Sequence, residues 1–200
     1  MNFDREIAAA FARCATEAAL AHGPEEALWS ITRTVPALLG DASAALRPNA
    51  FRENPAPTIG CAATVFLRTP NGRHHLISAP VNFLPEQYHE LVGIELGHPG
   101  EVARHHMSLL LKDTALHQGF VKILQSFRAG SSIFAPLLWQ GQYLGVLICA
   151  NAARGTYAER DLQALQGFAA LAATAFMAQG GPAWLASLDY AALPERLTAT

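Results

Sequence analysis

The stretch that decides the fold is Ser131–Asn151, SSIFAPLLWQGQYLGVLICAN. It predicts two apolar strands joined at Gln140-Gly141, because β-branched and aromatic residues suit a half-buried pleated surface. Pro136 lacks the N–H that sheet pairing needs, so it indicates a strand edge or a bulge at that point. A hairpin this apolar is not stable alone in water, so we expect further strands and a helix layer.

The composition limits the classes of function. The chain has 200 residues, 51% of them hydrophobic, which is enough for one domain with a substantial core. A net charge of −2 without a basic cluster argues against nucleic acid as a partner. Acidic residues near the N-terminus and the lack of a long apolar run argue against a leader or a membrane partner. Cys14, Cys61 and Cys149 have no CxxC spacing, which favours reduced thiols and a cytoplasmic location.

Apolar residues at helical spacing predict the main helices. The first is an N-terminal helix over 2–21, and the second runs over 24–40. Thr156 and Glu159 have the spacing of a capping box, in which the side chain of each residue accepts a hydrogen bond from the backbone N–H of the other. They predict that a third helix begins there and joins the same helix layer.

The other elements are shorter. Residues 41–57 contain three prolines and predict a long inserted loop. Residues 58–68 and 73–79 predict a second hairpin, which turns at Asn71-Gly72. We expect one domain over 1–178, followed by a C-terminal tail over 179–200 that carries apolar side chains.

Several pieces of the chain fall in the order and at the spacing of a known family. They are the turn GHPGEVAR at 97–104, the short strand LLKD at 110–113, and SIFAPL at 132–137 followed by Gly141 and Gly145. Over Pro24–Met177 the chain resembles the GAF domain. The resemblance implies an α+β fold, a two-layer sandwich. Its antiparallel sheet of five or six strands has helices on one face and the roof of a ligand pocket on the other.

The resemblance also implies a function. It indicates a sensory or regulatory domain that binds an unidentified small molecule and signals through a homodimer or a partner protein, without catalysis. No motif indicates a particular cofactor. One alternative is an interaction or dimerisation module whose pocket is filled by its own bulky side chains. Another is a domain that binds haem or a metal through its histidines.

The expected ligand contacts follow from the strands and the resemblance. Alternation along the strand places Ser132, Phe134 and Pro136 on one face, and the resemblance implies that this face borders the pocket. Aromatic side chains would give a lining suited to a largely apolar ligand. These are Phe66, Phe83, Phe120 and Phe134.

Polar candidates complete the predicted site. The glycine turn that ends at Gly100 opens a helix whose N-terminus favours an anion, with Arg68 as an added positive charge. His98 and His105 are two helical turns apart, and they share the candidate role with His75 and Asp113. They do not form a recognised metal-ligand motif, so no metal residues are assigned.

An enzyme is a further alternative. One branch of the GAF family reduces free methionine sulfoxide with paired cysteines in the roof and an acidic residue at the position of Ser132. The roof over 80–130 contains no cysteine, and that position carries serine. The sequence therefore disfavours this activity.

Overall fold

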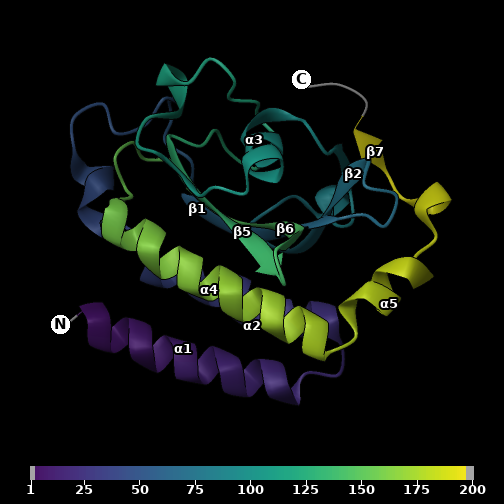
Figure 1. Cartoon of the computed structure of the whole chain (residues 1–200). Helices are drawn as coiled ribbons and strands as arrows, with labels where there is room; N and C mark the ends of the chain where they lie inside the picture. Colours follow the sequence, from purple (N-terminus) through teal and green to yellow (C-terminus); the bar gives the residue numbers. More distant parts are fainter. Residues whose placement is uncertain (1–2, 197–200) are drawn as a thin grey trace.

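The computed structural model describes residues 3–196, and it is an open sheet with helices on both faces. On one face lie α1 (Phe3–Leu20), α2 (Pro24–Leu38) and α4 (Glu159–Ala178), whereas α3 (Gly97–His105) crosses the other face (Figure 1). The predicted α+β architecture is thereby confirmed. Within the described residues, no helix is both long and apolar enough to span a bilayer.

The sheet has seven strands rather than the five or six expected. In sheet order they are β4 (Leu109–Leu111), β5 (Ser131–Trp139), β6 (Gln142–Asn151), β1 (Cys61–Arg68), β2 (His74–Val81), β3 (Leu91–Gly93) and β7 (Glu195–Arg196). All neighbours pair antiparallel except β3 and β7, which are parallel. The sequence did not predict β7, because a strand of two residues shows no alternation.

Short elements fill the connections. Short 3-10 helices cover Ala42–Leu46, Pro85–Gln87, Thr114–Leu116 and Tyr190–Ala192. The C-terminal segment contains α5 (Gly181–Ser187), where Leu185 is 5% exposed and joins the main core. The predicted tail thus packs on the body at Leu185 and returns to the sheet edge as β7. Its last residues, 197–200, lie outside the described residues.

The central hairpin has the geometry that its sequence predicts. Gln140 and Gly141 have φ angles of 50° and 79°, which the tight turn between β5 and β6 requires. Strand β4 pairs only with the segment of β5 from Ser132 to Phe134. Pro136 lies beyond the paired segment, so its missing N–H costs no hydrogen bond to β4. A Cβ atom on Gly145 would lie 2.3 Å from the carbonyl oxygen of Phe66, so glycine lets β1 approach β6.

The main core lies between the sheet and the helix layer. Ile133, Ala135 and Leu137 of β5 are fully buried there, on the face opposite to Ser132 and Phe134. α1 lies outermost, over α2 and α4 (Figure 1), where the rings of Phe11 and Phe168 stack with centroids 4.2 Å apart. The amphipathic pattern of the helices therefore predicts their packing correctly.

The start of α4 differs from the prediction. Its N-cap is Ala158, and Asp161 supplies the capping carboxylate, which accepts a hydrogen bond of 2.8 Å from the Ala158 N–H. The Thr156 hydroxyl donates instead to the carbonyl of Ala153. Asp161 also accepts from the Gly40 N–H at 2.9 Å. The buried carboxylate therefore ties the end of α2 to the start of α4.

The turn between β1 and β2 is also longer than predicted. Arg68 ends β1 and His74 begins β2, so the connection has more than the two residues expected. Only Gly72 of the Asn71-Gly72 pair has a positive φ, at 69°. The Asn71 side chain caps the loop by accepting a hydrogen bond of 2.9 Å from the N–H of Arg73.

Candidate ligand cavity

A cavity of about 50 Å³ lies on the sheet face opposite to the main helix layer. Its floor is formed by β1, β5 and β6, and its roof by the start of α3, Phe83 and the segment 120–129. The lining contains no Lys, Arg, Asp or Glu among the residues that the structure describes. The lining residues are Ala62, Ala63, Thr64, Phe66, Phe83, His98, Pro99, Phe120, Val121, Ile123, Leu124, Ala129, Ser132, Phe134, Ile148 and Ala150.

Strand alternation builds the floor. Ser132 pairs with Ala150, and Phe134 pairs with Ile148, so the side chains of both pairs point to the same face. On the other side of β6, Ala62 also pairs with Ala150. The two alanines leave space at the point where larger side chains would fill the cavity.

The roof segment from Val121 to Ala129 makes no backbone–backbone hydrogen bond with any described residue. Side chains hold it instead. Gln87 donates to the Ile123 carbonyl at 2.8 Å and accepts from the Gln125 N–H at 3.0 Å. Ser126 donates to the carbonyl of Asn82 at 2.6 Å. A segment held in this way can open without breaking a strand or a helix.

His98 is the main polar group of the cavity. It is 6% exposed, and its Nδ1 has no hydrogen-bond partner among the described residues. Its ring centroid lies 5.8 Å from that of Phe120 and 6.0 Å from that of Phe134. Burial lowers the pKa of His98; Glu101 opposes the shift, and His117 adds to it. The imidazole is therefore mainly neutral at pH 7 and can both donate and accept a hydrogen bond.

Ser132 supplies a second polar group on the floor. It is 2% exposed, and it lines the cavity. Thr64 satisfies its hydroxyl with the carbonyl of Ser78 at 2.9 Å. Of the three polar side chains in the lining, Thr64, His98 and Ser132, only His98 has a buried atom without a partner among the described residues.

The structure brings together six of the residues predicted from the sequence. The four predicted phenylalanines line the cavity, together with the histidine of the GHPG turn and the serine near the start of β5. These six are Phe66, Phe83, His98, Phe120, Ser132 and Phe134. The strand alternation behind Ser132 and Phe134 also extends to Ile148 and Ala150, which the sequence prediction did not include.

Other predicted contacts lie elsewhere. Pro136 borders a separate surface depression with Met107 and Leu138. Arg68 lies at the end of β1, in a depression shared with Tyr143 and His106. His105 is exposed at the end of α3, so it does not share the buried position of His98.

His75 faces the same side of the sheet as the cavity, but outside it. It is fully buried, and its Nε2 lies 2.8 Å from the Tyr143 hydroxyl. Burial, with a smaller contribution from Arg68, lowers the pKa of His75 to about 3. His75 is therefore a neutral core residue next to Phe66, whose ring centroid is 5.8 Å away.

Gly100 and Asp113 have structural contacts. A Cβ atom on Gly100 would lie 2.2 Å from the backbone carbonyl carbon of Glu95, so glycine is needed for the chain to pass there. Asp113 accepts a hydrogen bond of 2.5 Å from Arg52 and has Arg154 at 3.8 Å. It joins the inserted loop to the end of β6, away from the cavity.

Among the described residues, the cavity has no cysteine in its lining and no cluster of metal-binding side chains. None of Cys14, Cys61 and Cys149 lines it, and burial raises the pKa of Cys149 to about 12. Within residues 3–196, no three His, Cys, Asp or Glu side chains lie close enough to hold one metal ion.

Comparison with known proteins places this geometry in a family. The family model of the GAF domain matches residues 24–176, which is most of the chain. The chain belongs to the GAF family. GAF domains are sensory and regulatory domains. The cavity lining, α2 and all of α4 up to Phe176 lie within the matched residues, whereas α1 precedes them. No curated protein matches the chain.

Solved structures show the same fold. The GAF domain of a phosphoenolpyruvate-protein phosphotransferase from Coxiella burnetii has a TM-score of 0.68 at 18% identity, covering 90% of this chain and 99% of that one. The corresponding domain from Acinetobacter has a TM-score of 0.67 at 14% identity, covering 86% and 93%. A free methionine-R-sulfoxide reductase from Neisseria meningitidis, solved with its substrate, has a TM-score of 0.53 at 18% identity, covering 60% and 69%.

Proposed function

We propose that this GAF domain binds a small, neutral and largely apolar molecule that carries one or two hydrogen-bonding groups. The cavity between the sheet and the roof supports the proposal, because its lining is apolar and uncharged. His98 and Ser132 would contact the polar part of the guest. The unpartnered Nδ1 of His98 carries most of the argument, since buried polar atoms in proteins are normally satisfied.

The volume of the cavity sets a condition on binding. An apolar cavity of roughly 150 Å³ accepts a benzene ring, whereas this one measures about 50 Å³. A guest with a ring therefore needs the roof segment 120–129 to move outward. Binding would thus select an open roof, which is the conformational difference that a sensor must report.

The interaction module without a ligand is the second candidate. The small volume favours it, because Phe66, Phe83, Phe120, Phe134 and His98 already occupy much of the space. The unpartnered Nδ1 of His98 favours the receptor. A ligand-free module has no use for an unsatisfied polar atom in an apolar cavity.

We extend the proposal to a cytoplasmic homodimer, without enzymatic activity, that signals through a partner protein. The helix layer would form the contact between copies, because α1 lies outermost in that layer (Figure 1). Analytical ultracentrifugation across a range of protein concentrations tests this extension. A monomer at every concentration would remove the dimer from the proposal.

Phenol and toluene form a matched pair of probes for the cavity. They have nearly the same shape, but only phenol has a hydroxyl that can donate to His98. In a protein NMR titration, we expect phenol to shift the amide signals of His98, Gly100 and residues 119–134, and toluene to bind more weakly. Phenol should not bind Ala150→Leu, which fills the cavity, whereas Ala12→Leu on the exposed face of α1 should bind normally. Equal phenol binding by both variants would argue against this cavity.

A further inference from the structure

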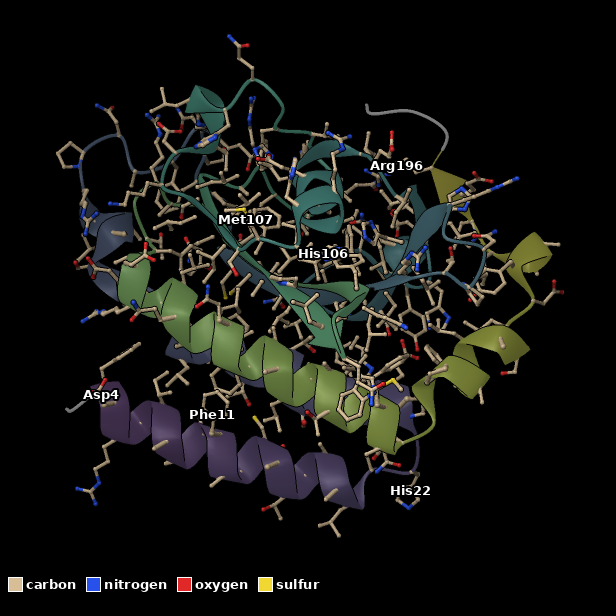
Figure 2. The ribbon with its side chains drawn as sticks, in the orientation of Figure 1. Asp4, Phe11, His22, His106, Met107 and Arg196 are labelled. Carbon is tan, nitrogen blue, oxygen red and sulfur yellow. The ribbon has the colours of Figure 1, made fainter. Side chains whose placement is uncertain are left out.

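The C-terminal strand β7 reaches back to the cavity roof through one side chain. Arg196 is the second residue of β7, which pairs with the outer edge of β3. It lies on the side of the sheet that carries α3, away from the α1 residue Phe11 (Figure 2). Its side chain is only 5% exposed, although arginine side chains are mostly exposed unless they are paired.

Three groups hold the Arg196 guanidinium. Its Nε and Nη2 donate to the two carboxylate oxygens of Glu90 at 2.9 and 3.0 Å, and the Glu90 side chain is 12% exposed. Its Nη1 donates to the carbonyl of Ile123 at 3.0 Å and to that of Lys122 at 3.3 Å. The bidentate pair with Glu90 fixes the plane of the guanidinium, so that Nη1 is aimed at the roof.

The roof depends on this contact more than an ordinary loop would. The segment 121–129 has no backbone–backbone hydrogen bonds to the described residues, and Ile123 lines the cavity. The Ile123 carbonyl accepts from Arg196 and from Gln87 at once. β7 itself is anchored by few backbone contacts, among them the hydrogen bond of 2.7 Å from the Leu91 N–H to the Pro194 carbonyl.

We propose that β7 is a latch on the cavity: Arg196, held by Glu90, fixes the roof at Ile123, so that opening the roof and releasing β7 are coupled. The inference rests on the proposed function, because it regulates access to the same cavity. The coupling is reciprocal: a guest that opens the roof weakens the hold on β7, and an event that removes β7 from β3 eases entry of the guest. The latch therefore joins the ligand site to the C-terminal end of the chain.

Hydrogen exchange on the full chain without any ligand tests the latch. In Arg196→Gln, amide exchange should become at least about tenfold faster in residues 119–130 and 88–94, since charge-assisted hydrogen bonds are lost. Glu195→Gln is the matched control. It lies in the same strand but pairs with His74 at 2.8 Å rather than with the roof. This control should leave roof exchange unchanged.

Two further measurements make the result decisive. Exchange in α4 must be the same in all variants, which separates roof opening from global unfolding. Arg196→Lys keeps the charge but loses the bidentate geometry, so its roof exchange should fall between those of the parent and Arg196→Gln. Unchanged roof exchange in Arg196→Gln would overturn the latch, whatever the cavity binds.

Phenol binding then separates the latch from the proposed function. If Arg196 restrains the roof, Arg196→Gln should bind phenol several-fold more tightly than Glu195→Gln. Faster roof exchange with equal phenol affinity would overturn the coupling to ligand entry. Failure of phenol to bind any variant would count against the proposed function, and roof exchange alone would still decide whether Arg196 holds the roof.

Discussion

The buried His75 should make the stability of the domain depend on pH in a predictable way. Its side chain is fully buried with Nε2 against the Tyr143 hydroxyl, and burial lowers its pKa to about 3 from an ordinary value of 6.5. Between these two values the unfolded chain binds a proton that the folded protein does not bind. The stability linked to His75 is therefore complete above pH 6.5 and is lost as the pH falls toward 3.

The size of the effect follows from the two pKa values. Integrated from pH 7 to pH 5, one histidine with this shift lowers the free energy of unfolding by about 2 kcal/mol. His98 changes stability in the same direction, because burial lowers its pKa as well. The contribution of His75 is therefore read from a difference between variants rather than from the parent protein alone.

Urea denaturation at pH 7 and pH 5 measures this difference. His75→Gln removes the titrating group, so the variant should lose about 2 kcal/mol less than the parent over this range. Tyr143→Phe is the control, since it removes the hydrogen bond but leaves His75 able to titrate. It should be less stable at both pH values and retain the pH dependence of the parent. Equal losses in the parent and His75→Gln would refute the reasoning.

Three further predictions concern packing and buried groups. Gly145→Ala should destabilise the domain by about 1–3 kcal/mol because its Cβ would collide with the β1 backbone, whereas Gly60→Ala, with no atom within 4 Å, is the control in the same denaturation assay. Burial acts to raise the pKa of Glu25, but hydrogen bonds from three neighbouring side chains outweigh it and lower this pKa. Glu25→Gln should therefore cost about 1–3 kcal/mol at pH 7, and equal stability would contradict the role of these bonds. Cys14 and Cys149 are fully buried, so their thiols should react with a disulfide reagent only after unfolding. Absorbance measures the number of thiols that have reacted.

The sequence predicts the parts of the site that lie in regular strands. Alternation along β5 places Ser132 and Phe134 on the cavity face, because side chains in a strand alternate strictly between faces. The same rule places Ile133 in the main core. The helix layer is predictable for a similar reason, since a spacing of three and four residues brings apolar side chains to one face.

The roof and the latch could not be predicted in this way. Ile123 and Leu124 lie in an irregular segment without periodicity, and side chains distant in sequence determine its position. Arg196 reaches Glu90 across 106 positions of the chain, and no local pattern indicates such a contact. The histidines show the same limit. His75 and His98 look alike in the sequence, and Nδ1 of each lacks a partner among the described residues. Only His98 lines the cavity, whereas Nε2 of His75 is bonded to Tyr143.

The central claim is that the cavity between the sheet and the roof holds a small molecule. Native mass spectrometry of protein freshly purified from cells tests it most directly, with the parent, Ala150→Leu and Ala12→Leu measured side by side. The account predicts that the parent and Ala12→Leu carry an additional small mass that denaturation releases, and that Ala150→Leu lacks it. An identical released mass from all three proteins would contradict the account, because the guest would then be bound outside the cavity.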